Sequence, residues 1–537
     1  MSGKPAARMG DKATKGLIVQ GSATVLIGSP GGVACSVCPG GMAVGSPVNP
    51  ALGAKVLVGE SELDFALPGA LPLVWQRRYS SYVNPQGPQC GLLGYGWHLS
   101  LEMRLELDEE ACRLFDDNGR VITFEPLAPG EHERCGSENL TLLRGGPATS
   151  PHPALTPWQQ QPRWAHIPVA WSNDARYLFA AGPNRTVWVF LAGAYTPGHY
   201  PLQCVIDPLG RQQHYQHNSQ GQLESISDGV GRQYALLGIR IHDGINDPVW
   251  GKDTGLRLAG VDLLHNPLAP DQGRQPLVRY HYSPEGDLVG VSDRSGTQVR
   301  EFAYHNHRLI LHRERGGPTH RYVYEHDGPG ARVIEQHNEG GLSYYFHYNN
   351  AENHVSVRDN LDREDHYQFE GEGGLKRLIA HTRADGSQIT YDYGRHGRKV
   401  AETDPLGRKT RYQYDGPGHL TDLHRPDGTS QHWGYDHDTS LLTRHTDAAA
   451  RQTHYRHDAH GRLIETQTPD GTTRYGYPDP QQQPLIADQP IEITDPTGKS
   501  RHLAYNDAGQ LIAHTDCSGH TQRYQYNGWG ELIQTTD

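Results

Sequence analysis

One motif recurs from about residue 200 onward and constrains the fold more than any other feature of this chain. In each copy an Asp-x-x-Gly turn precedes a polar strand that contains Tyr, and a second turn follows. The clearest copies begin at Asp404, Asp495 and Asp516. The interval of about 19–25 residues is typical of stacked repeats, in which each unit buries its apolar face only against its neighbours. The pattern therefore predicts a structural scaffold before it predicts a catalyst.

The anchoring side chains of these turns have a simple chemical interpretation. An Asp accepts hydrogen bonds from the amides of its own turn, and a Gly supplies positive φ. Catalysis by carboxylates needs one unique pair, whereas these residues repeat with the structure. We therefore expect these Asp and Gly residues to form turns, and we expect no enzymatic activity from this sequence. The turn anchors are Asp207, Asp404, Gly407, Asp495, Gly498, Asp516 and Gly519.

The composition favours a thin structure with much polar surface. Only 35% of the residues are apolar, yet there are 28 Tyr and 9 Trp against 8 Phe. Disordered chains are poor in aromatic residues, and Tyr suits positions that need an apolar body and a wet end. The net charge of −12 argues against nucleic acid and against an anionic membrane as partners, because both need clustered positive charge.

The cysteines and the distribution of apolar residues indicate the cell compartment. The seven Cys are few and widely spaced, so they imply no disulfide framework. The N-terminus lacks an apolar segment typical of a signal peptide, and no stretch approaches the length of a membrane span. We expect synthesis in the cytoplasm and, if the protein is secreted, export by another route.

Ahead of the repeats, the sequence predicts further strands. Residues Trp97 to Leu107 alternate apolar and polar side chains, which indicates one long strand with one buried face. Asn118-Gly119 is typical of a two-residue hairpin turn. Residues 126–165 are rich in Pro, Gly and Ser and suggest an irregular insertion, with strands again over 177–190. No amphipathic helix is predicted.

Geometry limits how the repeats are arranged. We expect residues 200–537 to form one curved, continuous antiparallel sheet. Open sheets of more than about ten strands curl or split. With strands about 4.8 Å apart, one turn of such a sheet would enclose a lumen on the order of 50 Å wide. Side chains cannot fill that space, so it would hold water or a guest.

These residues also carry a family resemblance. The repeats are similar to the tyrosine–aspartate (YD) repeats of the Rhs family. Residues 45–60, together with Leu71 to Tyr82 and Gly94 to Trp97, resemble the start of bacterial Rhs cores. The N-terminus is similar to the end of a PAAR domain. The residues of this PAAR-like motif are Pro5, Ala6, Ala7, Arg8, Gly10 and Asp11.

The resemblance implies an architecture and a role. It implies a partial PAAR-like β segment over 1–44, a core-opening β domain over 45–127, an irregular insertion with the first shell strands over 128–199, and YD repeats of a shell over 200–537. It also implies a polymorphic-toxin carrier of the type VI secretion system. The partners it implies are a C-terminal toxin cargo, a type VI spike protein and an adaptor chaperone.

Two departures from the family pattern lead to further expectations. PAAR domains hold zinc through His and Cys, but no His precedes His98 here, so we expect no stoichiometric zinc and no cofactor. The family's C-terminal self-cleavage motif and a variable toxin are absent from the sequence. We therefore expect a fragment or a truncated gene product, with the last strand as an unpaired, association-prone sheet edge.

For the other candidate residues, a structural role is a better explanation than a metal-binding or catalytic role. Cys35 and Cys38 have the spacing of half a zinc site, but no second pair accompanies them, so we expect buried thiols. The 32 His are spread along the repeats and suggest solvated or lumen-facing positions that change charge between pH 5 and 8.

The sequence thus predicts an all-β protein, a YD-repeat sheet curled into a spiral or hollow shell, that encloses and delivers a toxin. A cell-surface or carbohydrate-binding role is the alternative, since exposed aromatic residues serve that purpose as well. A secreted hydrolase is a further rival, and it should show one perturbed carboxylate pair in a cleft.

Overall fold

The computed structural model describes residues 12–13, 16–17, 33–82, 90–147, 157–193, 196–219 and 221–537. The PAAR-like motif, Pro5 to Asp11, lies outside these residues. Strands dominate the described parts, and the single α-helix among them, α1 (Val169–Ser172), has four residues. The short 3-10 helices are η1 (Glu60–Glu62), η2 (Ser100–Glu102), η3 (Trp158–Gln160), η4 (Pro162–Trp164), η5 (Gly373–Leu375), η6 (Arg395–Gly397) and η7 (Pro484–Ile486).

Several small sheets precede the main one. The pair β1 and β2 stands alone, β8 pairs with β9, and β10, β7, β5 and β4 form a sheet to which β6 adds. These strands are β1 (Lys12–Ala13), β2 (Gly16–Leu17), β4 (Val48–Asn49), β5 (Ala54–Leu57), β6 (Leu63–Ala66), β7 (Val74–Ser80), β8 (Cys90–Gly91), β9 (Gly94–Tyr95) and β10 (Trp97–Leu99).

A 37-stranded sheet makes up the rest of the fold, and successive strands pair antiparallel along most of it. The hairpin of β22 (Ile245–Asp247) and β23 (Gly251–Asp253) lies outside this sheet. The first strands of the 37-stranded sheet are β3 (Val33–Ala34), β11 (Arg104–Leu107), β12 (Cys112–Phe115), β13 (Val121–Phe124), β14 (His132–Cys135), β15 (Leu140–Arg144), β16 (Tyr177–Ala181), β17 (Val187–Leu191), β18 (His199–Ile206), β19 (Gln212–His217), β20 (Leu223–Ser227) and β21 (Gln233–Arg240).

The strands that continue the sheet follow a hairpin rhythm set by the repeats. The next ten are β24 (Leu256–His265), β25 (Gln275–Tyr282), β26 (Leu288–Asp293), β27 (Gln298–His305), β28 (Arg308–Glu314), β29 (Thr319–Tyr324), β30 (Val333–Asn338), β31 (Tyr344–Asn349), β32 (His354–Asp359) and β33 (Glu364–Glu370).

The last part of the sheet contains the most regular repeats. Its strands are β34 (Arg377–Thr382), β35 (Gln388–Tyr393), β36 (Lys399–Thr403), β37 (Lys409–Tyr414), β38 (Leu420–His424), β39 (Ser430–Tyr435), β40 (Leu442–Thr446), β41 (Gln452–His457), β42 (Leu463–Thr468), β43 (Gly471–Gly476), β44 (Glu492–Thr494), β45 (Ser500–Tyr505), β46 (Leu511–Thr515), β47 (Thr521–Tyr526) and β48 (Leu532–Thr536).

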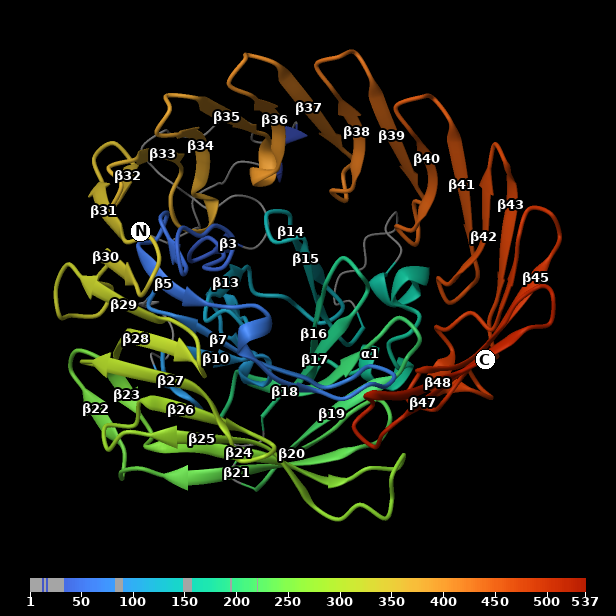
Figure 1. Cartoon of the computed structure of the whole chain (residues 1–537), viewed down its shortest axis with the longest axis horizontal. Coiled ribbons are helices and arrows are strands. Elements are labelled where there is room, and N and C mark those ends of the chain that lie inside the picture. Colours follow the sequence, from blue (N-terminus) through green and yellow to red (C-terminus); the bar gives the residue numbers. More distant parts are fainter. Residues whose placement is uncertain are drawn as a thin grey trace.

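The part of the main sheet from β18 to β48 curls into one turn of a spiral, which we call the wall. Figure 1 shows the strands from β18 to β48 following one another around a ring, with β47 and β48 returning to the neighbourhood of β18–β20. Open sheets of this size must curl because each strand is twisted relative to the last. The predicted single, curved, antiparallel sheet is confirmed.

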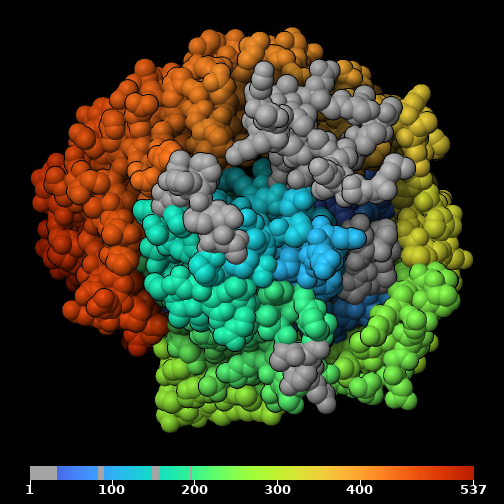
Figure 2. All heavy atoms as spheres, turned by 180° about the vertical axis from the view of Figure 1, so that it is seen from behind, coloured from blue at the N-terminus to red at the C-terminus, as the bar shows by residue number. Residues whose placement is uncertain are grey.

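The space inside the wall is partly occupied by the chain itself. The described part of residues 45–127, which we call the N-terminal β domain, lies within the ring in Figure 1, and Figure 2 shows it from behind in the middle of the later strands. Its apolar side chains merge with those of the wall into one core that extends as far as Phe369. The expectation that only water or a guest fills the interior is therefore wrong for the part of the interior that the N-terminal β domain occupies.

Burial falls sharply along the wall. Aromatic side chains of the wall that pack against the N-terminal β domain are buried, for example Tyr234 (0% exposed) and Phe302 (3%). Beyond Phe369, the buried apolar side chains among the described residues are Ala401, Pro478 and Ala487. Strands β34–β48 therefore keep one apolar face that the described part of the chain leaves largely uncovered.

The long strand predicted over Trp97 to Leu107 is wrong in its continuity. The alternating apolar side chains are buried from Trp97 to Leu105 and Leu107 is half-buried, but η2 divides the segment into β10 and β11, which belong to different sheets. The carboxylate of Glu102 accepts hydrogen bonds from the backbone N–H of Leu92 (2.8 Å) and Leu99 (3.0 Å). These bonds stabilise a corner that an alternation pattern does not reveal.

Two other local predictions also need correction. The β12–β13 hairpin closes with a three-residue loop, because Asp116 and Arg120 pair and Gly119 takes φ +72° as a bulge residue, so Asn118-Gly119 is no two-residue turn. The predicted irregular insertion over 126–165 contains β14 and β15, which are part of the main sheet. The strands predicted over 177–190 are present as β16 and β17.

Candidate functional site: the inner wall of the spiral

The repeat turns set the spacing of the wall. In the turn after β36, the Asp404 Oδ1 atom accepts hydrogen bonds from the N–H groups of Leu406 and Arg408, each 2.9 Å, and Gly407 has φ +76°. Oδ2 of the same Asp accepts a bond from Nε of Arg408 at 2.7 Å. The carboxylate therefore satisfies amides that the tight loop leaves without ladder partners.

The other anchors have the same geometry. Asp207 accepts N–H bonds from residues two and four positions ahead (3.0 and 2.9 Å), and Gly210 has φ +81°. Asp495 and Asp516 do the same, and each also accepts a hydroxyl bond from Thr497 or Ser518. In these two turns Gly498 and Gly519 have φ +81° and +88°.

Hydrogen bonding in these turns shifts the acidity of the anchors. The backbone N–H of Arg408 lowers the pKa of Asp404, while the Thr497 and Ser518 hydroxyls are the main causes that lower the pKa of Asp495 and Asp516. The carboxylates are thus held in their charged form. A general acid would need the opposite shift.

A ladder of tyrosine hydroxyls supports the strand bulges, and sequence reasoning missed it. About half of the strand pairs of the wall contain a register shift, where a carbonyl loses its regular ladder partner. At the β37–β38 shift that carbonyl belongs to Leu420, and the hydroxyl of Tyr435 donates to it at 3.1 Å. The donor lies fifteen residues after the acceptor. That constant spacing is the sequence signal that could have revealed the ladder.

Six further tyrosines donate across the same fifteen-residue interval, to the carbonyls of Leu309, Val333, Leu378, Lys399, Pro490 and Leu511. In β29, β35, β37 and β47 the donor is the second of two Tyr residues, whereas in β31 it is the last Tyr and in β45 the only one. The donors are Tyr324, Tyr348, Tyr393, Tyr414, Tyr505 and Tyr526. The Tyr of the repeat therefore fixes the wall, as well as lining it.

The first aromatic position of each strand points to the inside of the spiral. In β25, the hydroxyl of Tyr280 accepts a bond from Nε1 of Trp75 (2.8 Å) and donates to Asp64 (2.6 Å), both in the N-terminal β domain. In β29, the hydroxyl of Tyr322 donates to the carbonyl of Ser46 in the same domain. The covered half of the wall thus binds polypeptide through these rings.

A buried ion-pair network locks the N-terminal β domain against the wall. The Arg77 guanidinium contacts Glu62 (2.7 Å) and Asp64 (2.9 Å), and Arg300 of β27 contacts the other oxygen of Glu62. Burial raises the pKa of Glu62 although both guanidiniums oppose the shift. Burial also holds the pKa of the nearby Lys55 well below its usual range. These charges connect two parts of the fold.

The cross-strand register carries the inner face from β25 into the uncovered half. There the inner positions form an aromatic stripe whose rings are half-buried. We call the face of β35–β47 that carries this stripe the inner wall. Its rings are Tyr391, Tyr393, Tyr412, Tyr414, Trp433, Tyr435, Tyr455, Tyr475, Tyr505, Tyr524 and Tyr526.

The two ends of the spiral meet at a seam held by side chains. Arg294, in the β26–β27 turn, contacts Glu531 at 2.7 Å and lies 4.5 Å from the ring centroid of Trp529. Arg211 binds Asp488 through two bonds of 2.9 and 3.1 Å. Among the described strands, no ladder joins β45–β48 to β18–β26.

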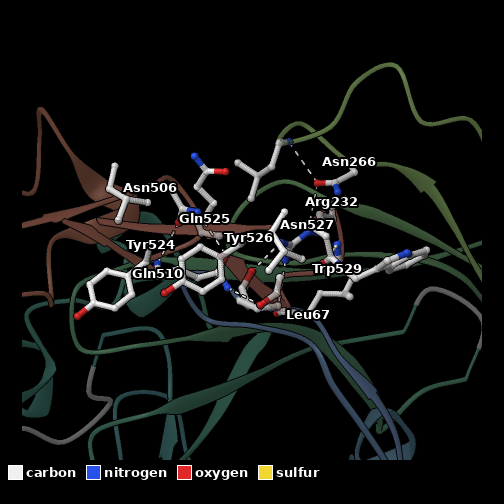
Figure 3. Close-up of a pocket in the computed structure, with 17 residues that line it drawn as sticks. Leu67, Arg232, Asn266, Asn506, Gln510, Tyr524, Gln525, Tyr526, Asn527 and Trp529 are labelled. Atoms are coloured by element: carbon white, nitrogen blue, oxygen red, sulfur yellow. Dashed lines mark hydrogen bonds between the residues drawn. The ribbon is translucent and has the colours of Figure 1, made fainter. Parts of the chain in front are cut away.

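A cavity of about 530 Å³ lies at this seam. It is lined by the turn that follows β47, by Tyr524 and Tyr526, and across the seam by Arg232, Asn266 and Leu67 (Figure 3). The Arg232 guanidinium is already bound to Asp228, Asn266 and backbone carbonyls. The cavity is therefore a gap left by side-chain closure of the ring.

The structure also places the remaining predicted sites. Cys35 is half-buried, and its Sγ accepts a bond from the N–H of Val121 at 3.3 Å, while burial raises the pKa of the thiol. Cys38 is exposed, so the prediction of a buried thiol is wrong there. No group of three or more metal-binding side chains occurs in the described ranges. None of the described helices is long and apolar enough to span a membrane.

Comparison with known families agrees with the repeats. A family model described as RHS Repeat matches residues 374–409, 397–430, 435–473, 457–500 and 505–537. A domain of unknown function, DUF6531, matches residues 45–124, within the N-terminal β domain.

Two characterised toxins are similar in sequence. The toxin protein Tse5 of Pseudomonas aeruginosa is 39% identical over 524 residues, which are 96% of this chain and 38% of Tse5. The double-stranded DNA deaminase toxin A of Burkholderia cenocepacia is 27% identical over 60% of this chain and 19% of its own length. The chain thus spans well under half the length of either relative.

Solved structures resemble the chain more distantly. The crystal structure of TcdB2-TccC3-TEV covers 86% of this chain and 26% of its own, at 12% identity and a TM-score of 0.38.

Proposed function

From the RHS repeats that this chain carries, we propose that it forms the wall of a shell that encloses a toxin polypeptide and delivers it on secretion. One observation carries the proposal. The face that binds the N-terminal β domain over β21–β33 continues over β35–β47 with equivalent rings that the described residues leave uncovered. A stripe of half-exposed rings on a concave face favours a polypeptide guest.

The similarity to Tse5, a toxin protein that is much longer than this chain, supports a toxin as the guest. We propose export by the type VI secretion system, with a spike protein and an adaptor chaperone as partners, as the PAAR-like residues Pro5 to Asp11 suggest.

The proposal assigns no catalytic step to this chain. Glu62, whose pKa is raised by burial, is engaged by Arg77 and Arg300, and Asp64 is engaged by Arg77. The pair between Glu62 and Arg300 joins the N-terminal β domain to the wall. The recurring Asp residues are engaged by their own turns. What supports a structural role is that each candidate carboxylate already has a partner within the fold.

A protease experiment tests enclosure. A flexible reporter segment with a protease site is fused after Asp537, and its cleavage is timed against the same segment added in trans. We expect slower cleavage of the fused segment, because the wall excludes the protease. Equal cleavage rates would contradict the proposal. Secretion of the fusion from cells with and without a working type VI sheath tests the route, and export that is the same in both cells would exclude it.

A further inference from the structure

Charged side chains are divided unequally between the two faces of β35–β47. At strand positions on the inner wall they are Lys399, Glu402 and Arg501, and the first two form an ion pair of 2.6 Å. The charged positions on the outer face are Asp392, Lys409, Arg411, Asp422, Arg444, Arg456, Glu465, Arg474, Glu492 and Arg523. With His counted as neutral, the inner wall is therefore close to neutral.

The covered half of the wall shows how this face binds polypeptide. Its donors bond to backbone carbonyls of the N-terminal β domain more often than to that domain's side chains. Lys376 Nζ donates to Ala51 O (2.9 Å), Gln213 Nε2 to Pro72 O (2.7 Å), and Arg232 Nη2 to Pro68 O (2.6 Å). Tyr322 donates to Ser46 O in the same way. Backbone carbonyls occur at every residue, so such contacts are independent of sequence.

The uncovered half offers equivalent donors to which the described part of the chain gives no partner. The hydroxyls of Tyr391, Tyr455 and Tyr475 have no hydrogen-bond partner within the described ranges, and these residues occupy the same first aromatic position as Tyr322. By contrast, Tyr393 at the second position donates to Leu378 O. The inner wall therefore combines apolar ring faces with unused donors.

Resting on the proposed function, we propose that the inner wall binds extended polypeptide through its backbone carbonyls and apolar side chains, without selecting for the charge of the cargo. Two effects follow from this chemistry. A near-neutral wall neither attracts nor repels a charged guest at contact distance. Ring stacking and hydrogen bonds to carbonyls also depend weakly on ionic strength, unlike binding by opposite charges.

The test uses two fluorescent, unstructured peptides of equal length that differ only in carrying Lys or Glu at the same positions. Their binding to the whole chain is measured by fluorescence anisotropy at ionic strengths from about 0.05 to 0.5 M. We expect dissociation constants that agree within about threefold across both peptides and all salt concentrations. A larger preference for either charge, or loss of binding with salt, would overturn the inference, as would absence of binding by both.

Matched variants locate the binding. The triple substitution Tyr391→Phe, Tyr455→Phe and Tyr475→Phe removes the free hydroxyls and should weaken both peptides equally, by about fivefold or more. On the outer face, Arg456→Gln should leave both dissociation constants unchanged. If the triple variant binds as well as the parent chain, the hydroxyls are not the donors and the inference fails.

The two proposals fail separately. A fused reporter that is protected from protease, together with charge-selective peptide binding, would refute this inference and leave enclosure intact. Equal binding of both peptides without protection of the reporter would refute enclosure instead.

Discussion

At the scale of single residues, the Tyr that defines the repeat does two different jobs. At the second aromatic position its hydroxyl supplies a bulge carbonyl with a donor, as Tyr414 does for Lys399 O at 2.9 Å. At the first position the hydroxyl is directed to whatever lies inside the spiral, as Tyr280 and Tyr322 show. This division explains why Tyr is preferred to Phe in a strand of which only one face is apolar.

The variant Tyr414→Phe tests the first of these jobs. It removes one intramolecular hydrogen bond from a half-buried site and should lower the free energy of unfolding by about 1 kcal/mol. Tyr455→Phe, whose hydroxyl has no partner in the described part of the chain, should change it by less than about 0.5 kcal/mol. Urea unfolding measures both. Equal effects of the two substitutions would show that the ladder contributes nothing to stability.

A half-buried histidine, His98, gives the protein a predictable response to acid. His98 packs against Gly119, and burial lowers its pKa from 6.5 to about 4. In the unfolded chain the His98 imidazole is therefore protonated below about pH 6.5, whereas in the folded chain it is protonated only below about pH 4. Stability should fall as the pH drops through that window, by on the order of 3 kcal/mol from this residue.

The variant His98→Gln should flatten this part of the profile, which is measured as the denaturation midpoint at successive pH values. The slope is the readout, because the substitution also changes packing. An unchanged slope between pH 6.5 and 4 would mean that His98 titrates normally in the fold.

At the scale of elements, the wall needs the N-terminal β domain over only part of its length. The joint between them is polar at its centre, where Glu62 (0% exposed) bridges Arg77 and Arg300. Breaking a buried ion pair by removing one partner leaves an uncompensated charge, which is the costly case.

The variant Glu62→Gln should therefore destabilise the joint by about 3 kcal/mol. We expect earlier proteolysis within residues 45–127 than in the parent chain. The control is Glu314→Gln, which also removes a partner of Arg300 but lies 56% exposed and should cost less than about 1 kcal/mol. If the two variants are digested at the same rate, the network does not hold the domain in place.

The elements also show how much of the fold a sequence of this kind reveals. Period-two alternation and Asp-x-x-Gly turns predict the strands of β34–β48, because there each hairpin repeats the last. The alternation fails at Trp97 to Leu107, because the corner depends on hydrogen bonds that one side chain, Glu102, accepts from nearby backbone amides, and periodicity does not reveal these bonds. The composition of residues 126–165 suggests loops, yet pairing with β16 draws Leu140–Arg144 into the sheet.

The site could be predicted in part. The preference for Tyr and the polar faces indicate a wet interior, and the curl follows from strand number. The sequence does not show that the N-terminal β domain fills half of that interior, because contacts such as Trp75 with Tyr280 join residues far apart in the chain. The fifteen-residue spacing of the hydroxyl ladder was present in the sequence, but its meaning depends on where the bulges lie.

At the scale of the whole molecule, the strands are held together more strongly around the ring than at the seam where its two ends meet. Around the ring, neighbouring strands are joined by backbone ladders, whereas the seam is closed by contacts such as Arg294 with Glu531 and Arg211 with Asp488. Exposed ion pairs contribute little to stability and are screened by salt. The seam is therefore the line along which the ring opens at the lowest cost.

The central claim is that the inner wall contacts a polypeptide guest. Hydroxyl-radical footprinting tests it on the chain alone and on the chain extended after Asp537 by an unstructured polypeptide segment. We predict that the extension lowers the labelling of Tyr391, Trp433, Tyr455 and Tyr475 and leaves that of the outer-face residues His454 and His502 unchanged. Unchanged labelling of the inner rings, or protection of the outer face instead, would contradict the claim.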